Sequence, residues 1–232
     1  MKIIGIIGGI SWHSTQDYYR YINEGVNKAL GGMNFARLIM HSMNYGEIKK
    51  NNDAGDWDAT FNLLAEACEN MKAGGAEAIV LGANTMHLLA ERIEEKVKLP
   101  VIHIATATAE AISKQQLTKV ALLGTKFTME KTFFTDKLKA KNIEAIIPDD
   151  ADRDFIHWTI FEELGRGIIS AESKARYISI IHKLVQQGAQ GAILGCTEIP
   201  MLIKEGDVNV PVFDTTKIHS DAAVQFMTED HF

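Results

Sequence analysis

Short apolar strands alternate with longer amphipathic helices along almost the whole chain of 232 residues. The first strand, within Lys2–Gly8, is rich in isoleucine and ends in glycine, which is typical of a central strand buried on both faces. A helix is predicted over Ser14–Leu30, where apolar side chains recur at helical spacing until Gly31 and Gly32 end the pattern. Because parallel strands need a crossover between them, this alternation predicts an α/β fold with parallel sheets covered by helices.

The second half of the chain repeats the order of elements in the first half. Val120–Thr125 resembles Ile4–Gly9, and Leu194–Glu198 resembles Leu81–Thr85. Further strands and helices of the first half are predicted at Arg37–Met40, Trp57–Met71, Ala78–Leu81 and from about Thr85 to Val97. Those of the second half are predicted at Val120–Leu123, from about Thr128 to Lys141, and at Ile143–Ile147, Arg153–Leu164, Ser173–Gln187 and Ala192–Leu194.

This repeat predicts two pseudo-symmetric parallel-sheet α/β lobes that face each other. Pro100–His103 and Pro211–Asp214 are the best crossing points, so we expect residues 1–102 plus 212–232 in the first lobe and residues 103–211 in the second. Open parallel sheets bind ligands at the carboxyl ends of their strands. We therefore expect the active site in the cleft between the lobes.

The composition excludes several classes of function. Hydrophobic residues make up 46% of the chain and charged residues 23%, with a net charge of −6. No net positive charge is available to neutralise phosphates, so nucleic acid is not expected as a partner. No apolar run is long enough to cross a membrane. With only two cysteines the chain has no disulfide framework, and we predict a cytoplasmic protein that binds a small polar ligand.

The strongest single motif, Gly195-Cys196-Thr197-Glu198, follows the last predicted strand of the second half. A thiol at the end of a buried strand and the start of a helix lies where the helix dipole favours the thiolate. This position marks Cys196 as a candidate catalytic thiol, although a free cysteine is more often an inert core residue. Thr197 and Glu198 offer a hydroxyl and a carboxylate for a substrate ammonium group or a nearby histidine. Cys68, on the apolar face of a predicted helix, is interpreted as a core residue.

A glycine-rich turn follows the first strand. The segment from Gly5 to Ser11 lacks the G-x-G-x-x-G spacing of a dinucleotide site, so no nucleotide is expected. The turn either presents Ser11 and free N–H groups to a small carboxylate, or is a tight turn without a ligand. The histidines lack the spacing of metal ligands, so no metal site is predicted. His87 either lines the cleft or caps a helix, and His219 is placed likewise.

Taken together, these motifs resemble the aspartate/glutamate racemase family in their order and spacing, over essentially the whole chain. The resemblance is strongest to the bacterial L-aspartate/glutamate-specific racemases. It implies a commonly dimeric isomerase with two α/β lobes, no pyridoxal phosphate, metal or nucleotide, and an acidic amino acid as substrate. Two acid/base residues of such an enzyme flank the substrate α-carbon, one removing a proton and the other delivering one. The matching segments are Gly8–Trp12, Asn84–His87, Gly124–Met129, Phe161–Leu164, Gly195–Ile199 and Pro211–Thr215.

One position departs from the family pattern. Cys196 matches the acid/base residue of the second lobe, but Ala83 stands where the family has a cysteine or threonine, and alanine carries no proton. The positions that hold the substrate are retained. By the resemblance, these are Ser11, Asn84, Thr85, Thr125, Thr128 and Thr197.

Several functions fit this combination. The leading one is racemisation of aspartate or glutamate, with Cys196 as thiolate base or thiol acid and with water or another side chain serving the face next to Ala83. A lyase or decarboxylase that needs a single cysteine is the second, and a binding protein without turnover is the third. Ala83 is also compatible with a replacement made to trap a substrate. Arg166 is the candidate for binding the side-chain carboxylate of the substrate.

Overall fold

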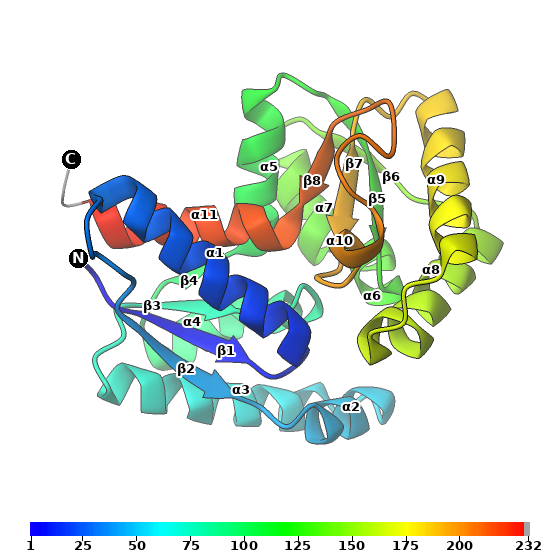
Figure 1. Ribbon diagram of the computed structural model, residues 1–232. Coiled ribbons are helices and arrows are strands. Elements are labelled where there is room, and N and C mark those ends of the chain that lie inside the picture. Colours follow the sequence, from blue (N-terminus) through cyan, green and yellow to red (C-terminus); the bar gives the residue numbers. More distant parts are fainter. Residues whose placement is uncertain (230–232) are drawn as a thin grey trace. The chain divides into compact units, whose positions relative to one another are not determined.

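The computed structural model describes residues 1–229 and divides into two units, each built on one parallel sheet of four strands (Figure 1). Unit 1 comprises Met1–His103 and, from His219 onward, the described residues up to Glu229, and unit 2 comprises Ile104–Ile218. This architecture confirms the predicted α/β fold of two parallel-sheet lobes. Residues 230–232, which we assigned to the first lobe, lie outside the described part of the chain.

Unit 1 has the strand order β2-β1-β3-β4, with helices on both faces of the sheet (Figure 1). Successive side chains of β1 point to opposite faces, so Ile6 packs on one face and Ile7 on the other. The core around Ile6 is covered by α1 and α11, and the core around Ile7 by α3 and α4. The elements are β1 (Ile4–Gly8), α1 (Trp12–Leu30), β2 (Leu38–Ser42), α2 (Tyr45–Asp53), α3 (Trp57–Ala73), β3 (Ala78–Leu81), a 3₁₀ turn η1 (Thr85–Leu89), α4 (Ala90–Val97), β4 (Val101–Ile102) and α11 (Thr215–Thr228).

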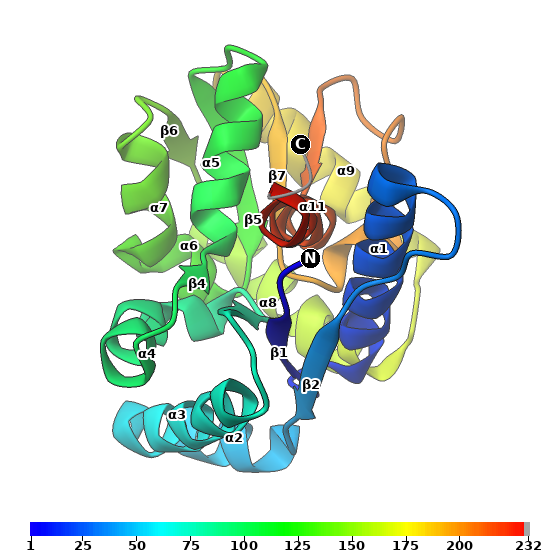
Figure 2. The ribbon, with the colours of Figure 1, turned by 90° about the vertical axis from the view of Figure 1, so that its left-hand side faces the viewer.

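Unit 2 repeats the plan with the strand order β6-β5-β7-β8. Leu122 faces a core with α5 and α7, which lie side by side in Figure 2, and Leu123 faces a core with α8 and α9. The elements are α5 (Ile104–Lys114), β5 (Lys119–Gly124), α6 (Lys126–Glu130), α7 (Thr132–Lys139), β6 (Glu144–Ile146), α8 (Asp150–Glu162), a 3₁₀ turn η2 (Leu164–Arg166), α9 (Ala171–Gln186), β7 (Ala192–Gly195), α10 (Ile199–Leu202) and β8 (Val212–Asp214).

The division between the units differs from the expected boundaries at His103, which we expected in the second lobe and which belongs to unit 1, and at one longer segment. We expected residues 212–218 in the first lobe, but β8 pairs with β7 and so belongs to the second sheet. The chain passes from unit 2 to unit 1 between Ile218 and His219, within α11. Within residues 1–229, no helix is both long enough and apolar enough to cross a membrane.

Two predicted helices are interrupted in the structure. The helix expected from about Thr128 to Lys141 is divided into α6 and α7, because Lys131 has an extended backbone with φ −92° and ψ 155°. The helix expected from about Thr85 to Val97 begins as the 3₁₀ turn η1 and becomes α-helical only at Ala90. Both interruptions lie in segments that follow a central strand, β5 or β3, and that carry predicted site residues.

Candidate active site

The two central strands of unit 1 end side by side. Ile7 of β1 is paired with Leu81 of β3, so the turns that follow these strands leave the same edge of the sheet. The predicted site residues of unit 1 lie on these two turns: Ser11, Ala83, Asn84 and Thr85.

The turn after β1 depends on glycine and on a buried threonine. Gly9 has φ +79°, and a Cβ atom there would lie 2.3 Å from the Met43 carbonyl oxygen, so no other residue fits. The Thr15 hydroxyl accepts a hydrogen bond from the Gly9 N–H (2.9 Å) and donates one to the Ser11 carbonyl (2.7 Å). The Ser11 side chain does not cap α1. Thr15 of α1 thus fixes the backbone of the turn at Ser11, whereas the Ser11 hydroxyl makes no capping hydrogen bond to the helix. Trp12, which follows, is 59% exposed.

The turn after β3 contains Ala83, the position that the resemblance matches to an acid/base residue. Ala83 and Thr85 are half-buried, whereas Asn84 is buried. The Ala83 side chain is a methyl group packed beside the core of α3 and α4, so it offers no proton. Its carbonyl oxygen accepts a hydrogen bond from Nδ1 of His87 (3.0 Å).

The two central strands of unit 2 also end in register, with Gly124 of β5 paired with Gly195 of β7. Thr125 and Cys196 therefore leave the sheet at the same level. The Thr125 hydroxyl accepts a hydrogen bond from the Thr128 N–H (3.3 Å) and so caps α6. The Thr128 hydroxyl is fully buried and lies 3.3 Å from that of Thr125, so a hydrogen bond between the two hydroxyls helps to fix the Thr125 side chain.

Cys196 is held by its own turn. The thiol donates a hydrogen bond to Oε2 of Glu198 (2.9 Å), and the Thr197 hydroxyl donates to the same oxygen (3.0 Å). All three side chains are buried. Burial, followed by the negative charge of Glu198 and its hydrogen bond, raises the pKa of the Cys196 thiol well above its usual value. At neutral pH the group is a thiol that points its proton at a carboxylate.

This result corrects the expected activation of Cys196 by a helix dipole. The helix α10 begins only at Ile199 and has four residues, so its dipole is small and displaced from the sulfur. The effects of burial and of Glu198 outweigh it. The structure therefore does not support an ionised thiol in the ligand-free protein.

A second layer of polar residues behind Cys196 was not anticipated from the sequence. Tyr177 of α9 is fully buried, and its pKa is raised by burial first and then by its electrostatic interactions with Cys196 and Glu163. Glu163 accepts a short hydrogen bond from the Ser173 hydroxyl (2.6 Å). Tyr177 stands in the apolar stripe of its helix, and that pattern predicts packing rather than proximity to a thiol.

The surroundings of Arg166 and Cys68 bear on the roles that the sequence suggested for them. Arg166 has an exposed side chain that pairs with Glu162, so its charge is already engaged by a neighbouring carboxylate. Cys68 is fully buried in the core with Leu64 and Met71, and burial raises its pKa to about 12. Its interpretation as a packing residue agrees with this position.

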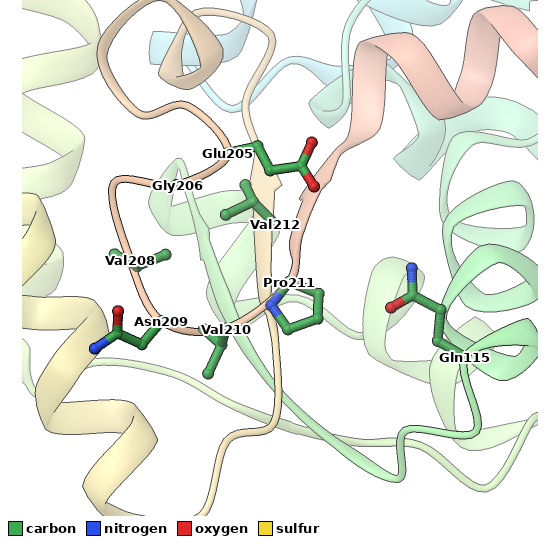
Figure 3. Close-up of a pocket in the computed structure, with 8 residues that line it drawn as sticks. All are labelled: Gln115, Glu205, Gly206, Val208, Asn209, Val210, Pro211 and Val212. Atoms are coloured by element: carbon green, nitrogen blue, oxygen red, sulfur yellow. The ribbon is translucent and has the colours of Figure 1, made fainter.

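A separate depression in unit 2 contains none of the predicted site residues. It has a volume of about 370 Å³ and lies at the amino end of β8, next to Pro211, with the polar side chains of Gln115, Glu205 and Asn209 around it (Figure 3). Because β7 and β8 are parallel, this end of the sheet is opposite the edge that carries Cys196.

The chain is similar to known proteins over nearly its full length. Residues 7–223 match the model of the family described as Asp/Glu/hydantoin racemase. A Yersinia pestis protein provisionally described as an Asp/Glu racemase is 48% identical, with 98% of this chain and 99% of that chain covered and a TM-score of 0.92. An aspartate racemase homologue from Pyrococcus horikoshii is 36% identical, with 98% and 100% covered and a TM-score of 0.86. A broad-specificity amino-acid racemase from Bacillus subtilis is 20% identical over 92% of this chain and 93% of its own.

Proposed function

Since the chain belongs to the Asp/Glu/hydantoin racemase family, we propose that it is an amino-acid racemase for aspartate or glutamate that works without a cofactor. The observation that carries the proposal is the buried Cys196 thiol at the end of β7, with its proton directed at Glu198. Proton transfer at the α-carbon needs a positioned acid/base group, and this thiol is one.

In the proposed reaction Cys196 delivers the proton. A base removes the α-proton from one face of the amino acid, and the electron pair passes into the carboxylate to give an enediolate. The Cys196 S–H bond then breaks, and its proton forms the new C–H bond on the opposite face. The raised pKa of the thiol suits this role, because the acid form is already present at neutral pH. The thiolate that remains recovers a proton from solvent.

The base on the other face is assigned to water, because Ala83 has no acid/base group. A single positioned acid/base group contributes a factor on the order of 10²–10⁴ in rate. Racemisation is therefore expected to be slower by about that factor than with cysteine or threonine at position 83.

The substrate carboxylates are assigned to backbone N–H groups and to the hydroxyls of Ser11, Thr85 and Thr125, with Asn84 as a further polar contact. The Thr197 hydroxyl donates to Glu198, so its oxygen is assigned to accept from the substrate ammonium group. Donors fixed by the fold stabilise the negative charge that develops in the enediolate. The capping arrangement of Thr125 on α6 supports this assignment, because it holds the residue rigid beside Cys196.

Incubation with L-aspartate in heavy water tests the proposal. Chiral chromatography with mass detection is expected to show the opposite enantiomer accumulating with deuterium on its α-carbon, since the proton that Cys196 delivers is replaced from solvent. Cys196→Ala is expected to abolish both signals, while Cys68→Ala, the matched control, is expected to keep them. A Cys196→Ala protein with full activity would overturn the assignment.

A second function is favoured by the same pair of residues. One protonated thiol and an inert methyl group suit an enzyme that removes carbon dioxide from a malonate-like acid and protonates the resulting carbanion once. Loss of substituted malonates, followed beside the racemisation assay, distinguishes the two activities. Tight binding of aspartate by calorimetry without either reaction would instead identify a binding protein.

We also propose that the protein acts in the cytoplasm as a homodimer. Edge strand β2 and the segment before it carry exposed apolar side chains, with Met33 85%, Phe35 52% and Met40 36% exposed. A second copy of the chain is the expected cover for these side chains. Light scattering of the purified protein, with Phe35→Ser for comparison, measures the assembly.

A further inference from the structure

The first turn after β3 is closed by a side chain instead of by the backbone. In an α-helix the N–H of residue 87 would bond to the carbonyl of residue 83. Here the His87 N–H bonds to the Asn84 carbonyl (3.1 Å), as in a 3₁₀ turn, and the Ala83 carbonyl would be left over. The His87 ring occupies that place, with Nδ1 3.0 Å from the Ala83 oxygen. A carbonyl accepts only, so Nδ1 carries the ring proton.

His87 belongs to a group of histidine rings in unit 1, in which His87 and His219 are buried and His103 is half-buried. Its ring centre lies 4.8 Å from that of His103 and 5.3 Å from that of His219. Nε2 of His219 donates to the Ile102 carbonyl (2.6 Å), and the Tyr18 hydroxyl donates to Nδ1 of His219 (2.8 Å). Both His87 and His219 are fixed as neutral rings, in opposite tautomers.

Packing alone does not account for an imidazole at position 87. The ring is 2% exposed, and its Nε2 has no hydrogen-bond partner among residues 1–229. A buried polar atom without a partner disfavours folding, and an apolar side chain of similar size would avoid that cost. What the apolar side chain could not supply is the hydrogen bond to the carbonyl of residue 83.

We propose that His87 is the positioning residue of the acid/base turn, fixing the backbone of residues 83–85 through the Ala83 carbonyl whatever side chain stands at position 83. This inference deepens the proposed function and rests on it for its effect on turnover. Because the bond is made to the backbone, it positions the turn in the same way for alanine and for an acid/base side chain at position 83.

The experiment compares His87 variants in the protein with alanine or cysteine at position 83. His87→Leu fills the site without a donor, and His87→Asn keeps an N–H close to the position of Nδ1. We expect the amide NMR signals of Asn84 and Thr85 to shift in His87→Leu and to stay near their original positions in His87→Asn. Thr60→Val, which removes another buried hydroxyl bond of unit 1 (2.8 Å to Asn52), controls for a general loss of stability.

Turnover is measured on the same set of proteins. With Ala83→Cys we expect a large gain in racemisation, and adding His87→Leu should lower kcat by about ten-fold or more with folding retained by thermal melting. His87→Asn should recover most of that loss. Unchanged amide signals in His87→Leu, or an undiminished gain in the double variant, would overturn the positioning role. No gain from Ala83→Cys with normal amide shifts would instead count against the racemase assignment and leave the positioning role supported.

Discussion

The Cys196 thiol donates a hydrogen bond to the Glu198 carboxylate, and this pair determines the acid/base chemistry available at the end of β7. Replacing Glu198 by glutamine removes the negative charge that raises the thiol pKa. We therefore expect Glu198→Gln to lower the pKa of Cys196, and thus to raise the rate of its alkylation at neutral pH. The pH dependence of alkylation, followed by intact mass, measures the shift.

The other cysteine provides the control for this prediction. Cys68 is buried, and its pKa of about 12 is due first to burial and then to the negative charge of Glu69. Its alkylation, measured in a Cys196→Ala background, is expected to be slow and unaffected by Glu198→Gln. If the substitution leaves the Cys196 profile unchanged, the carboxylate does not control the thiol.

The two sheets place a glycine at the same point of their second central strand. A Cβ atom on Gly82 would lie 2.7 Å from the Ile7 carbonyl of β1, and one on Gly195 would lie 2.7 Å from the Leu123 carbonyl of β5. Both contacts are to backbone atoms, which do not move aside easily. The repeated glycine therefore lets two strand ends approach closely in each unit, which brings the site turns together.

We predict that Gly195→Ala destabilises the protein by about 1–3 kcal/mol, the usual cost of overpacking, and displaces Cys196. Urea unfolding and the racemisation assay measure the two effects. Gly46→Ala in α2 is the control, since the nearest atom there is a side-chain oxygen of Asn44 at 3.3 Å and alanine favours a helix. Equal stability of the Gly195 and Gly46 variants would contradict the close approach.

Helices and strands with a strong apolar pattern were predicted from the sequence, whereas elements with a weak pattern were missed. The runs at Ala78–Leu81 and Trp57–Met71 gave β3 and α3 within a few residues, because burial on a sheet or helix face dictates their composition. The helix α5, rich in alanine and threonine, was missed, as was the two-residue strand β4. Their formation depends on partners that are distant in the sequence.

The site was predictable as a set of motifs and not as a set of contacts. The position of Cys196 at a strand end followed from the alternation of elements, but its bond to Glu198 depends on a side-chain rotamer within the turn. The contact between His87 and the Ala83 carbonyl likewise requires a 3₁₀ turn where the spacing predicted an α-helix. Local sequence patterns do not distinguish these two helices over one turn.

Across the whole molecule, acid should weaken unit 1 because it contains the buried neutral rings. Burial lowers the pKa of His87 to about 4 and that of His219 to about 3. Once unfolded, both rings would titrate near their ordinary value of about 6.5, so between there and about pH 4 the unfolded chain binds more protons than the folded one. The two neutral rings therefore make their whole contribution to the free energy of unfolding above about pH 6.5. This contribution decreases as the pH falls.

The expected slope is about 1.4 kcal/mol per pH unit for each buried histidine. Urea unfolding from pH 7 to 4.5 measures it, with single-tryptophan variants that retain Trp57 in unit 1 or Trp158 in unit 2 as local reporters. The Trp57 transition should move to lower urea as the pH falls, and His87→Asn should remove about half of that movement, because one of the two rings no longer titrates. A Trp57 midpoint that is constant over this range would show that the buried rings do not exclude protons, and that acid sensitivity lies elsewhere in the protein.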